Sequence, residues 1–187
     1  TNWFNFLSPL ATEIKIIQTF HDSYLISARD LDFLILTGGN DVFEVCNDEL
    51  SKKRDELEFQ LIEDCVSYNI PILGVCRGMQ ILNMYFGGTL CAQEGHVRTI
   101  HDLDTSVNWL DCVDRANSFH NWSISRSSLP SKLNIGATCV RDDSVEAFEH
   151  PRYKIRGVMW HPERWEIRLG DEMQYYNNQR KILKFMT

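Results

Sequence analysis

The sequence predicts an α/β fold: a flavodoxin-like, three-layer arrangement in which a mostly parallel sheet lies between helices. Two apolar runs carry this prediction. Residues 31–36 (LDFLIL) lead directly into the glycine turn 37–40, and residues 71–75 (PILGV) lead into Cys76. Continuous apolar runs of this length, each followed by a turn, are typical of strands that are buried on both faces of a parallel sheet.

The other elements are predicted from the period of the apolar residues and from the Gly, Pro, Asn and Asp residues that end each segment. Residues 91–131 have no clear period, so we expect an irregular loop there, and long irregular stretches in compact domains are commonly functional. Because no repeat or linker interrupts the chain, we expect residues 1–187 to form a single domain. In chain order we expect strands at 13–20, 31–36 and 71–75, helices at 48–68 and 79–86, strands at 133–140, 145–148 and 155–160, and a closing helix at 172–185.

Composition excludes several classes of function. The net charge of -7 disfavours a nucleic-acid partner, which requires a basic face, and the basic run at 52–54 is expected to be the solvated start of a helix. No apolar stretch approaches the roughly 20 residues of a membrane helix, and no signal peptide is evident. Without a CxxC pair, the cysteines predict free thiols in a reducing cytoplasm. The six are Cys46, Cys65, Cys76, Cys91, Cys112 and Cys139.

Cys76 lies in the most informative segment of the chain. It stands between a strand and a helix, with Gly74 and Gly78 two residues to either side. This is the G-x-nucleophile-x-G elbow, in which glycines allow a tight turn that holds the nucleophile clear of the sheet. The N-terminus of the following helix is expected to favour the thiolate. The alternative, a buried structural cysteine, is the role we expect for the other five.

A cysteine nucleophile requires a histidine base that a third group orients. His161 ends a predicted strand, Pro162 fixes the direction of the chain, and Glu163 can reach the far nitrogen of the imidazole. A backbone-satisfied histidine and a solvated acid are the alternatives for these two residues. Together with the elbow they predict a triad of Cys76, His161 and Glu163.

The other five histidines have different expected roles. His120 is the second candidate for the base. His96 and His101 flank a polar segment, but their spacing matches no strong ligand pattern, so we expect no metal. His21 and His150 are expected at the surface.

The glycine turn after residues 31–36 supplies the remaining part of the site. Exposed N–H groups of residues 38–40, together with the N–H of Arg77, can form an oxyanion hole. Ligands of parallel sheets bind at the carboxyl ends of the strands, where this turn and Cys76 both fall. A plain glycine turn is the alternative.

Five segments together resemble the class I glutamine amidotransferases, in the branch that contains γ-glutamyl-γ-aminobutyrate hydrolase. They are LILTGGND (34–41), GVCRGMQILN (74–83), YFGGTL (85–90), NSFH (117–120) and MWHPER (159–164). The resemblance implies the same Cys-His-Glu triad, no cofactor and a sheet whose first strand precedes Thr1. It implies an oxyanion hole at Gly39 and Arg77, and a pocket for the glutamyl group formed by Gln80, Asn117, Ser118, Phe119 and His120.

The resemblance also implies an activity, the hydrolysis of a γ-glutamyl amide to glutamate and an amine through a cysteine thioester. Trp122 stands where many branch members have Gln, and the HNW and MWHPER segments are similar to members associated with bacterial surface polysaccharides. Candidate substrates are therefore γ-glutamyl-CDP-amidate, used in capsule phosphoramidate synthesis, and γ-glutamyl-GABA. Trp122 is expected to contact the leaving group, with Arg98, Arg115 and Arg126 near its phosphates. The alternative is that Trp122 packs inward as a core aromatic and the three arginines are solvated.

Three alternatives remain. The first is a glutaminase subunit that delivers ammonia to a synthetase. The synthetase would have to be a separate protein, because the chain contains no GxxxxGK[ST] segment for ATP. The others are a non-catalytic binding domain and a cysteine peptidase or thiol-dependent chaperone of similar fold. The expected partner is a small γ-glutamyl substrate, with neither nucleic acid nor membrane, and self-association into a homo-oligomer is left open.

Overall fold

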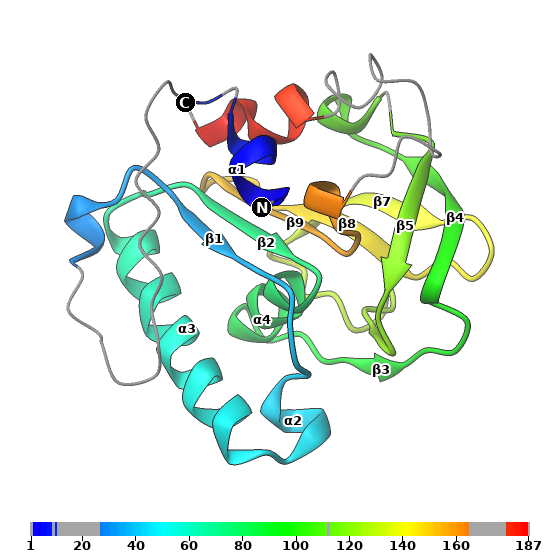
Figure 1. Cartoon of the computed structure of the whole chain (residues 1–187), viewed down its shortest axis with the longest axis horizontal. Coiled ribbons are helices and arrows are strands. Elements are labelled where there is room, and N and C mark those ends of the chain that lie inside the picture. Colours follow the sequence, from blue (N-terminus) through cyan, green and yellow to red (C-terminus); the bar gives the residue numbers. More distant parts are fainter. Residues whose placement is uncertain (1, 9, 11–26, 112, 165–178, 187) are drawn as a thin grey trace.

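The computed structural model describes residues 2–8, 10, 27–111, 113–164 and 179–186 (Figure 1). Its main sheet has seven strands in the order β1-β2-β9-β8-β7-β4-β5, and a separate ribbon pairs β3 with β6. The helices are α1 (Asn2–Leu7), α2 (Phe43–Cys46), α3 (Glu49–Ser67) and α4 (Arg77–Tyr85), with 3-10 turns η1 (Ala28–Asp30), η2 (Asn108–Leu110), η3 (Pro162–Arg164) and η5 (Lys184–Met186). The strands are β1 (Leu34–Leu36), β2 (Ile72–Val75), β3 (Cys91–Ala92), β4 (Val97–Thr105), β5 (Arg115–Phe119), β6 (Trp122–Ser123), β7 (Asn134–Cys139), β8 (Val145–Glu149) and β9 (Ile155–Val158).

Helices cover both faces of the sheet, which confirms the predicted three-layer α/β class. Helices α3 and α4 pack on one face, and α1 and the segment 179–186 lie on the other (Figure 1). Apolar clusters fill both interfaces, because β2 contributes Ile72 to one and Leu73 to the other. All four residues of β2 are buried, as expected of an interior strand that is covered on both faces.

The sheet is more mixed than the sequence predicts. Within the described part of the chain, β1, β2 and β9 pair in parallel, whereas the pairs from β9 through β8, β7 and β4 to β5 are antiparallel. The parallel part is the one that brings strand ends together at one edge. That edge carries the candidate active site.

The prediction of an irregular loop at 91–131 is wrong, because the segment contains β3, β4, β5 and β6. The sequence conceals β4, since along its nine residues only His101 and Leu103 are buried. A strand whose inward positions include a histidine shows no alternation of apolar and polar residues.

The other expected elements match the structure within a few residues where it describes them. The strand at 31–36 begins at Leu34, and the helix at 48–68 begins after Asp48, whose carboxylate accepts the N–H of Ser51 as an N-cap. The expected strand at 13–20 lies outside the described residues. Of the closing helix, residues 179–183 are helical and η5 follows. No helix in the described segments is long and apolar enough to cross a membrane.

Candidate active site

The elbow at Cys76 has the tight geometry that its glycines predict. Cys76 has φ 53° and ψ −108°, a strained conformation for a residue with a side chain, and its N–H donates to Val158 O at 2.8 Å. A Cβ on Gly74 would lie 2.6 Å from Gly78 O, and a Cβ on Gly78 would collide with Leu36 O. Both glycines are therefore required for β2 to turn directly into α4.

The Cys76 thiol is buried, with 6% of the residue exposed. Burial raises its pKa to about 11, and the backbone N–H of Arg77 offsets this only in part. The sequence predicts the opposite direction, from the N-terminus of α4, and burial outweighs that effect. The resting residue is thus a protonated thiol, and its use as a nucleophile requires a base.

His161 and Glu163 form a hydrogen-bonded pair directly after β9. His161 Nδ1 lies 2.7 Å from Glu163 Oε1, and both residues are buried. The 3-10 turn η3, which begins at Pro162, returns the carboxylate to the imidazole two residues earlier. The contact fixes one nitrogen of the ring and leaves Nε2 for chemistry.

The imidazole of His161 reaches across the sheet. Strand β2 lies between β1 and β9, Gly38 follows β1, and His161 follows β9. A Cβ on Gly38 would lie only 2.5 Å from His161 Cε1, so the ring meets the glycine turn on the far side of β2. The imidazole therefore spans the carboxyl end of β2, where Cys76 begins the elbow.

Asn117 on β5 fixes the backbone that carries the imidazole. Its Oδ1 accepts the N–H of His161 at 2.9 Å, and its Nδ2 donates to His161 O at 3.0 Å. Two residues further along the strand, the ring of Phe119 meets the imidazole edge-on, with 5.7 Å between centroids. Both residues were expected in the glutamyl pocket. The side-chain amide of Asn117 is occupied by the backbone of His161.

Two of the remaining pocket residues contact the backbone carbonyl of Trp122, and Ser118 does not. Gln80 Nε2 donates to Trp122 O at 2.9 Å, and His120 Nδ1 lies 3.0 Å from the same oxygen. Ser118 is fully buried and donates from its hydroxyl to His96 O. Gln80, His120 and Trp122 are thus brought together, whereas the side chain of Ser118 points to His96.

The glycine turn predicted to hold the oxyanion is supported by an arginine. Gly39 has φ 152°, and a Cβ there would lie 2.5 Å from Arg54 Nη1. Arg54 also donates to Thr37 O at 3.0 Å, which fixes the turn from α3. The side chain of Arg77 forms ion pairs with Asp55 and Glu58 of α3, and these hold the start of α4. The two elements that carry the expected oxyanion N–H groups are therefore both tied to α3.

Comparison with known proteins identifies the family. The model of the Peptidase C26 family matches residues 16–106 and 108–163. The chain belongs to the Peptidase C26 family. This confirms the resemblance to class I glutamine amidotransferase-like proteins that the motifs indicate.

Relatives of this Peptidase C26 member cover most of its length. It is 35% identical over 161 residues to the γ-glutamyl-CDP-amidate hydrolase of Campylobacter jejuni subsp. jejuni, covering 86% of this chain and 74% of that protein. It is 34% identical over 172 residues to the glutamine amidotransferase-like protein YvdE of Lactococcus lactis subsp. lactis, covering 76% and 70%. A glutamine amidotransferase structure from Methylobacillus flagellatus superposes with a TM-score of 0.69 at 18% identity, covering 88% and 65%, and supports the fold.

Two residues at the site of this Peptidase C26 member were missed by sequence reasoning. Arg54 belongs to the basic run 52–54, which looks like an ordinary solvated helix start. Arg164 ends the MWHPER segment; its guanidinium lies 5.5 Å from the ring centre of Phe119 and 3.6 Å from Glu163 Oε1. With its side chain 49% exposed, Arg164 is a cation at the edge of the site that solvent can reach. Its place in the motif was the available signal.

Three other histidines converge on one buried glutamate. We define the histidine cluster as His96, His101, His120 and Glu146, all of which are buried. His120, the second candidate for the base, thus has Glu146 as its neighbour, at 3.8 Å between Nε2 and Oε1. His150 is also buried, contrary to the expected surface position, because its ring packs on Phe86. His21 lies outside the described residues.

The described cysteines other than Cys76 have free thiols, as the sequence predicts. Cys65 and Cys139 are buried and Cys91 is partly buried, which agrees with structural roles. Cys46 is exposed, so the expectation of a buried structural cysteine is wrong at this position. Cys112 lies outside the described residues.

Proposed function

We propose that the protein hydrolyses a γ-glutamyl amide by nucleophilic catalysis with Cys76, His161 and Glu163. The observation that carries the proposal is the strained elbow of Cys76 at the end of β2, together with an imidazole that reaches across that strand end to Gly38 and is hydrogen-bonded to a buried carboxylate. Strained backbone at a sheet edge serves to present a nucleophile, and an acid-histidine pair serves to move its proton. Membership of the family and the named activity of the Campylobacter relative support the same reaction class.

In the first half of the reaction, His161 Nε2 takes the proton of the Cys76 thiol while the sulfur attacks the γ-carbonyl carbon. We expect a distance of roughly 3–4 Å between the sulfur and this nitrogen for that transfer. The N–H groups of Gly39 and Arg77 stabilise the oxyanion. Collapse breaks the C–N bond, His161 returns the proton to the leaving nitrogen, and a γ-glutamyl thioester remains on Cys76.

In the second half, water replaces the amine. His161 removes a proton from water, which attacks the thioester carbonyl, and the same N–H groups hold the second oxyanion. The C–S bond then breaks, Cys76 regains its proton from His161, and glutamate leaves. Glu163 stabilises the imidazolium that forms in each half of the reaction.

The leaving group we propose is a nucleotide phosphoramidate, so that the substrate is γ-glutamyl-CDP-amidate, consistent with a place in capsule phosphoramidate synthesis. The named substrate of the Campylobacter relative and the exposed pair of Arg164 and Phe119 beside His161 support this choice. A guanidinium binds phosphate oxygens well and an aromatic ring stacks on a base. Arg164 replaces two arginines expected from sequence, because it lies beside Phe119 and the catalytic pair, whereas Arg115 and Arg126 pair with Asp102 and Asp143.

A panel of γ-glutamyl amides tests the substrate. We expect kcat/KM for γ-glutamyl-CDP-amidate to exceed that for glutamine and γ-glutamyl-GABA by at least about 100-fold, since a stacked base and a bound phosphate contribute about 3 kcal/mol together. Arg164→Gln and Trp122→Ala should each reduce this preference by about 10-fold while leaving glutamine hydrolysis nearly unchanged. The control is Arg152→Gln, which removes an exposed arginine from the loop before β9.

Two other outcomes are informative. Equal kcat/KM values for glutamine and every larger amide would contradict the nucleotide substrate. Ammonia release from glutamine that appears only when a second protein is added would favour the glutaminase-subunit alternative. The reducing cytoplasm is the compartment we propose, because the described thiols are free.

A further inference from the structure

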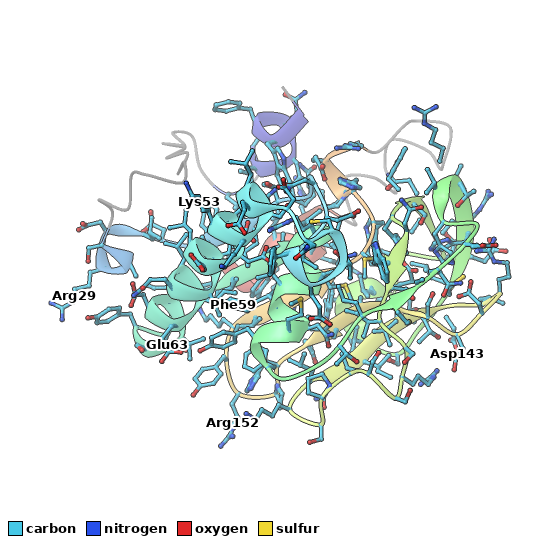
Figure 2. The ribbon with its side chains drawn as sticks, turned by 90° about the horizontal axis from the view of Figure 1, so that it is seen from below. Arg29, Lys53, Phe59, Glu63, Asp143 and Arg152 are labelled. Atoms are coloured by element: carbon cyan, nitrogen blue, oxygen red, sulfur yellow. The ribbon has the colours of Figure 1, made fainter. Side chains whose placement is uncertain are left out.

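The histidine cluster is assembled from three separate parts of the chain. His96 and His101 belong to β4 and its approach, His120 follows β5, and Glu146 is in β8. The cluster borders the β7–β8 turn, because His96 Nε2 lies 2.7 Å from Asp142 Oδ2. Asp143 of that turn lies across the molecule from Arg29 (Figure 2). The proposed proton transfers use none of these side chains, and only His120 among them was expected in the glutamyl pocket.

The spacing within the histidine cluster does not suit hydrogen bonds. Glu146 Oε1 lies 3.7 Å from His96 Nδ1 and 3.8 Å from His120 Nε2, whereas N–H···O bonds are typically about 2.9 Å. Ligand atoms around a tetrahedral Zn²⁺ with bonds of about 2.1 Å are separated by about 3.4 Å. The two measured separations are closer to this ligand spacing than to a hydrogen bond, and the two nitrogens lie within 4.8 Å of each other.

Both imidazole nitrogens lack a hydrogen-bond partner. His96 Nδ1, His120 Nε2 and the other carboxylate oxygen, Glu146 Oε2, are buried and form no hydrogen bond within the described residues, whereas Glu146 Oε1 accepts from the Ser144 hydroxyl at 3.4 Å. Buried polar atoms without partners cost about 1–3 kcal/mol each, so this grouping calls for an explanation. A bound cation would satisfy both nitrogens at once.

The surrounding residues orient the imidazoles as in metal sites. His96 directs its other nitrogen, Nε2, at Asp142 Oδ2 at 2.7 Å, and His120 directs Nδ1 at Trp122 O at 3.0 Å. Ligating histidines commonly direct the second ring nitrogen at a carboxylate or a backbone carbonyl in this way. His101 Nε2 lies 3.3 Å from Glu146 Oε2, where it can hold the second carboxylate oxygen.

We propose that His96 Nδ1, His120 Nε2 and Glu146 bind one divalent transition-metal ion, Zn²⁺ by ligand type and spacing, with His101 positioning Glu146. The three ligands lie within 4.8 Å of one another, and His96 also forms a second such set with His101 and Cys139. The sequence predicts no metal here, because the ligands are scattered over 51 positions between His96 and Glu146.

We expect the proposed metal ion to stabilise the fold and to take no part in the hydrolysis. All three ligands are buried, so we expect the ion to enter as the chain folds and to stabilise the packing of β4 and β5 on β8. Strand β5 also carries Asn117, which holds the backbone of His161. The ion would thereby stabilise the strand that positions the catalytic base.

The test uses the full 187-residue chain, unfolded in denaturant with chelator and refolded with or without Zn²⁺. After gel filtration, we expect about one Zn²⁺ per wild-type chain by elemental analysis and a higher midpoint of thermal unfolding in the Zn²⁺ sample. Glu146→Gln and His120→Gln should lose the bound Zn²⁺, and His101→Gln should weaken its binding by about 10–100-fold. The matched control is His150→Gln, a buried histidine outside the cluster, which should retain the ion.

Two results would overturn the proposal. One is a wild-type chain that refolds in chelator with the same unfolding midpoint as with Zn²⁺ and retains no ion. The other is equal retention by wild type, Glu146→Gln and His150→Gln, which would mean adventitious binding elsewhere. If Glu146→Gln does not refold, the wild-type comparison alone decides.

Discussion

The candidate active site and the histidine cluster both pair imidazole with a buried carboxylate, yet their geometries differ. His161 Nδ1 and Glu163 Oε1 are 2.7 Å apart and come from a single turn. In the histidine cluster the nearest contact to Glu146 is 3.3 Å, from His101, and the contributing segments are far apart in sequence. A close, local pair is suited to holding a proton, whereas a wider and multi-sided arrangement is suited to holding a cation.

Strand β5 joins the two regions by alternation. Asn117 and Phe119 contact His161, while Ser118 donates to His96 O and His120 approaches Glu146. Successive side chains of a strand point to opposite faces, so one short strand serves both groups. A change in the His161–Glu163 pair should therefore affect proton transfer, whereas a change in the histidine cluster should affect the stability of β5, which supports His161.

The largest expected effect separates the two carboxylates. Glu163→Gln should lower kcat by about 10⁴-fold, because the amide cannot stabilise the imidazolium of His161. It should change the free energy of unfolding by less than about 1 kcal/mol, since the shape is preserved. Steady-state kinetics and urea denaturation measure the two effects.

The matched substitution Glu146→Gln should show the opposite balance. It removes a fully buried carboxylate that three buried imidazoles approach and should lower the free energy of unfolding by about 2–4 kcal/mol. If Glu163→Gln retains full kcat, or if the two variants lose stability equally, the distinction between the regions is wrong.

A smaller effect is expected at Asn117, which connects β5 to the base. Asn117→Ala should lower kcat by about 100-fold through misplacement of His161, with little change in KM. It also leaves the backbone N–H of His161 without its partner, at a cost of about 1–3 kcal/mol in the free energy of unfolding, whereas His161 O keeps the N–H of Arg164. Asn134→Ala, at an exposed position of β7, is the control and should change neither quantity. A raised KM with normal kcat would instead place Asn117 in substrate binding.

The smallest effect concerns alkaline pH. Burial raises the pKa of the Cys76 thiol to about 11, above its value in the unfolded chain, so the folded state retains a proton that the unfolded state releases. The free energy of unfolding should therefore decrease by about 1–2 kcal/mol as pH rises from about 9 to 11.

Cys76→Ala should reduce this slope, measured by urea denaturation at several pH values. The control is Cys46→Ala, since Cys46 is exposed and should leave the slope unchanged. Identical slopes in wild type and Cys76→Ala would contradict a buried protonated thiol.

The sequence predicts the candidate active site better than its surroundings, for physical reasons. The elbow needs Gly74 and Gly78 at fixed offsets from Cys76, and the acid of the pair lies two residues from its histidine, so the site is encoded locally. The histidine cluster depends on the pairing of β4, β5 and β8, which no spacing indicates. Arg54 was missed for the same reason, since its target, the glycine turn, is 14 or more positions away.

The parts of the fold follow the same division. Strand β2 and helix α3 follow directly from apolar runs, helical period and the Asp48 cap. Strand β4 was missed because polar and charged residues occupy most of its positions and its burial comes from pairing with β5 and β7. Tertiary context decides such strands, and local patterns do not reveal them.

The most direct test of the central claim is to trap the acyl-enzyme. Wild-type protein mixed with γ-glutamyl substrate and quenched in acid should carry a γ-glutamyl adduct on Cys76, located by peptide mass spectrometry and released by hydroxylamine. Cys76→Ala should carry no adduct and should lose about 10⁶-fold in kcat while keeping its fold, whereas Cys65→Ala should keep both adduct and activity. An adduct on another residue, or substantial turnover by Cys76→Ala, would contradict Cys76 as the nucleophile.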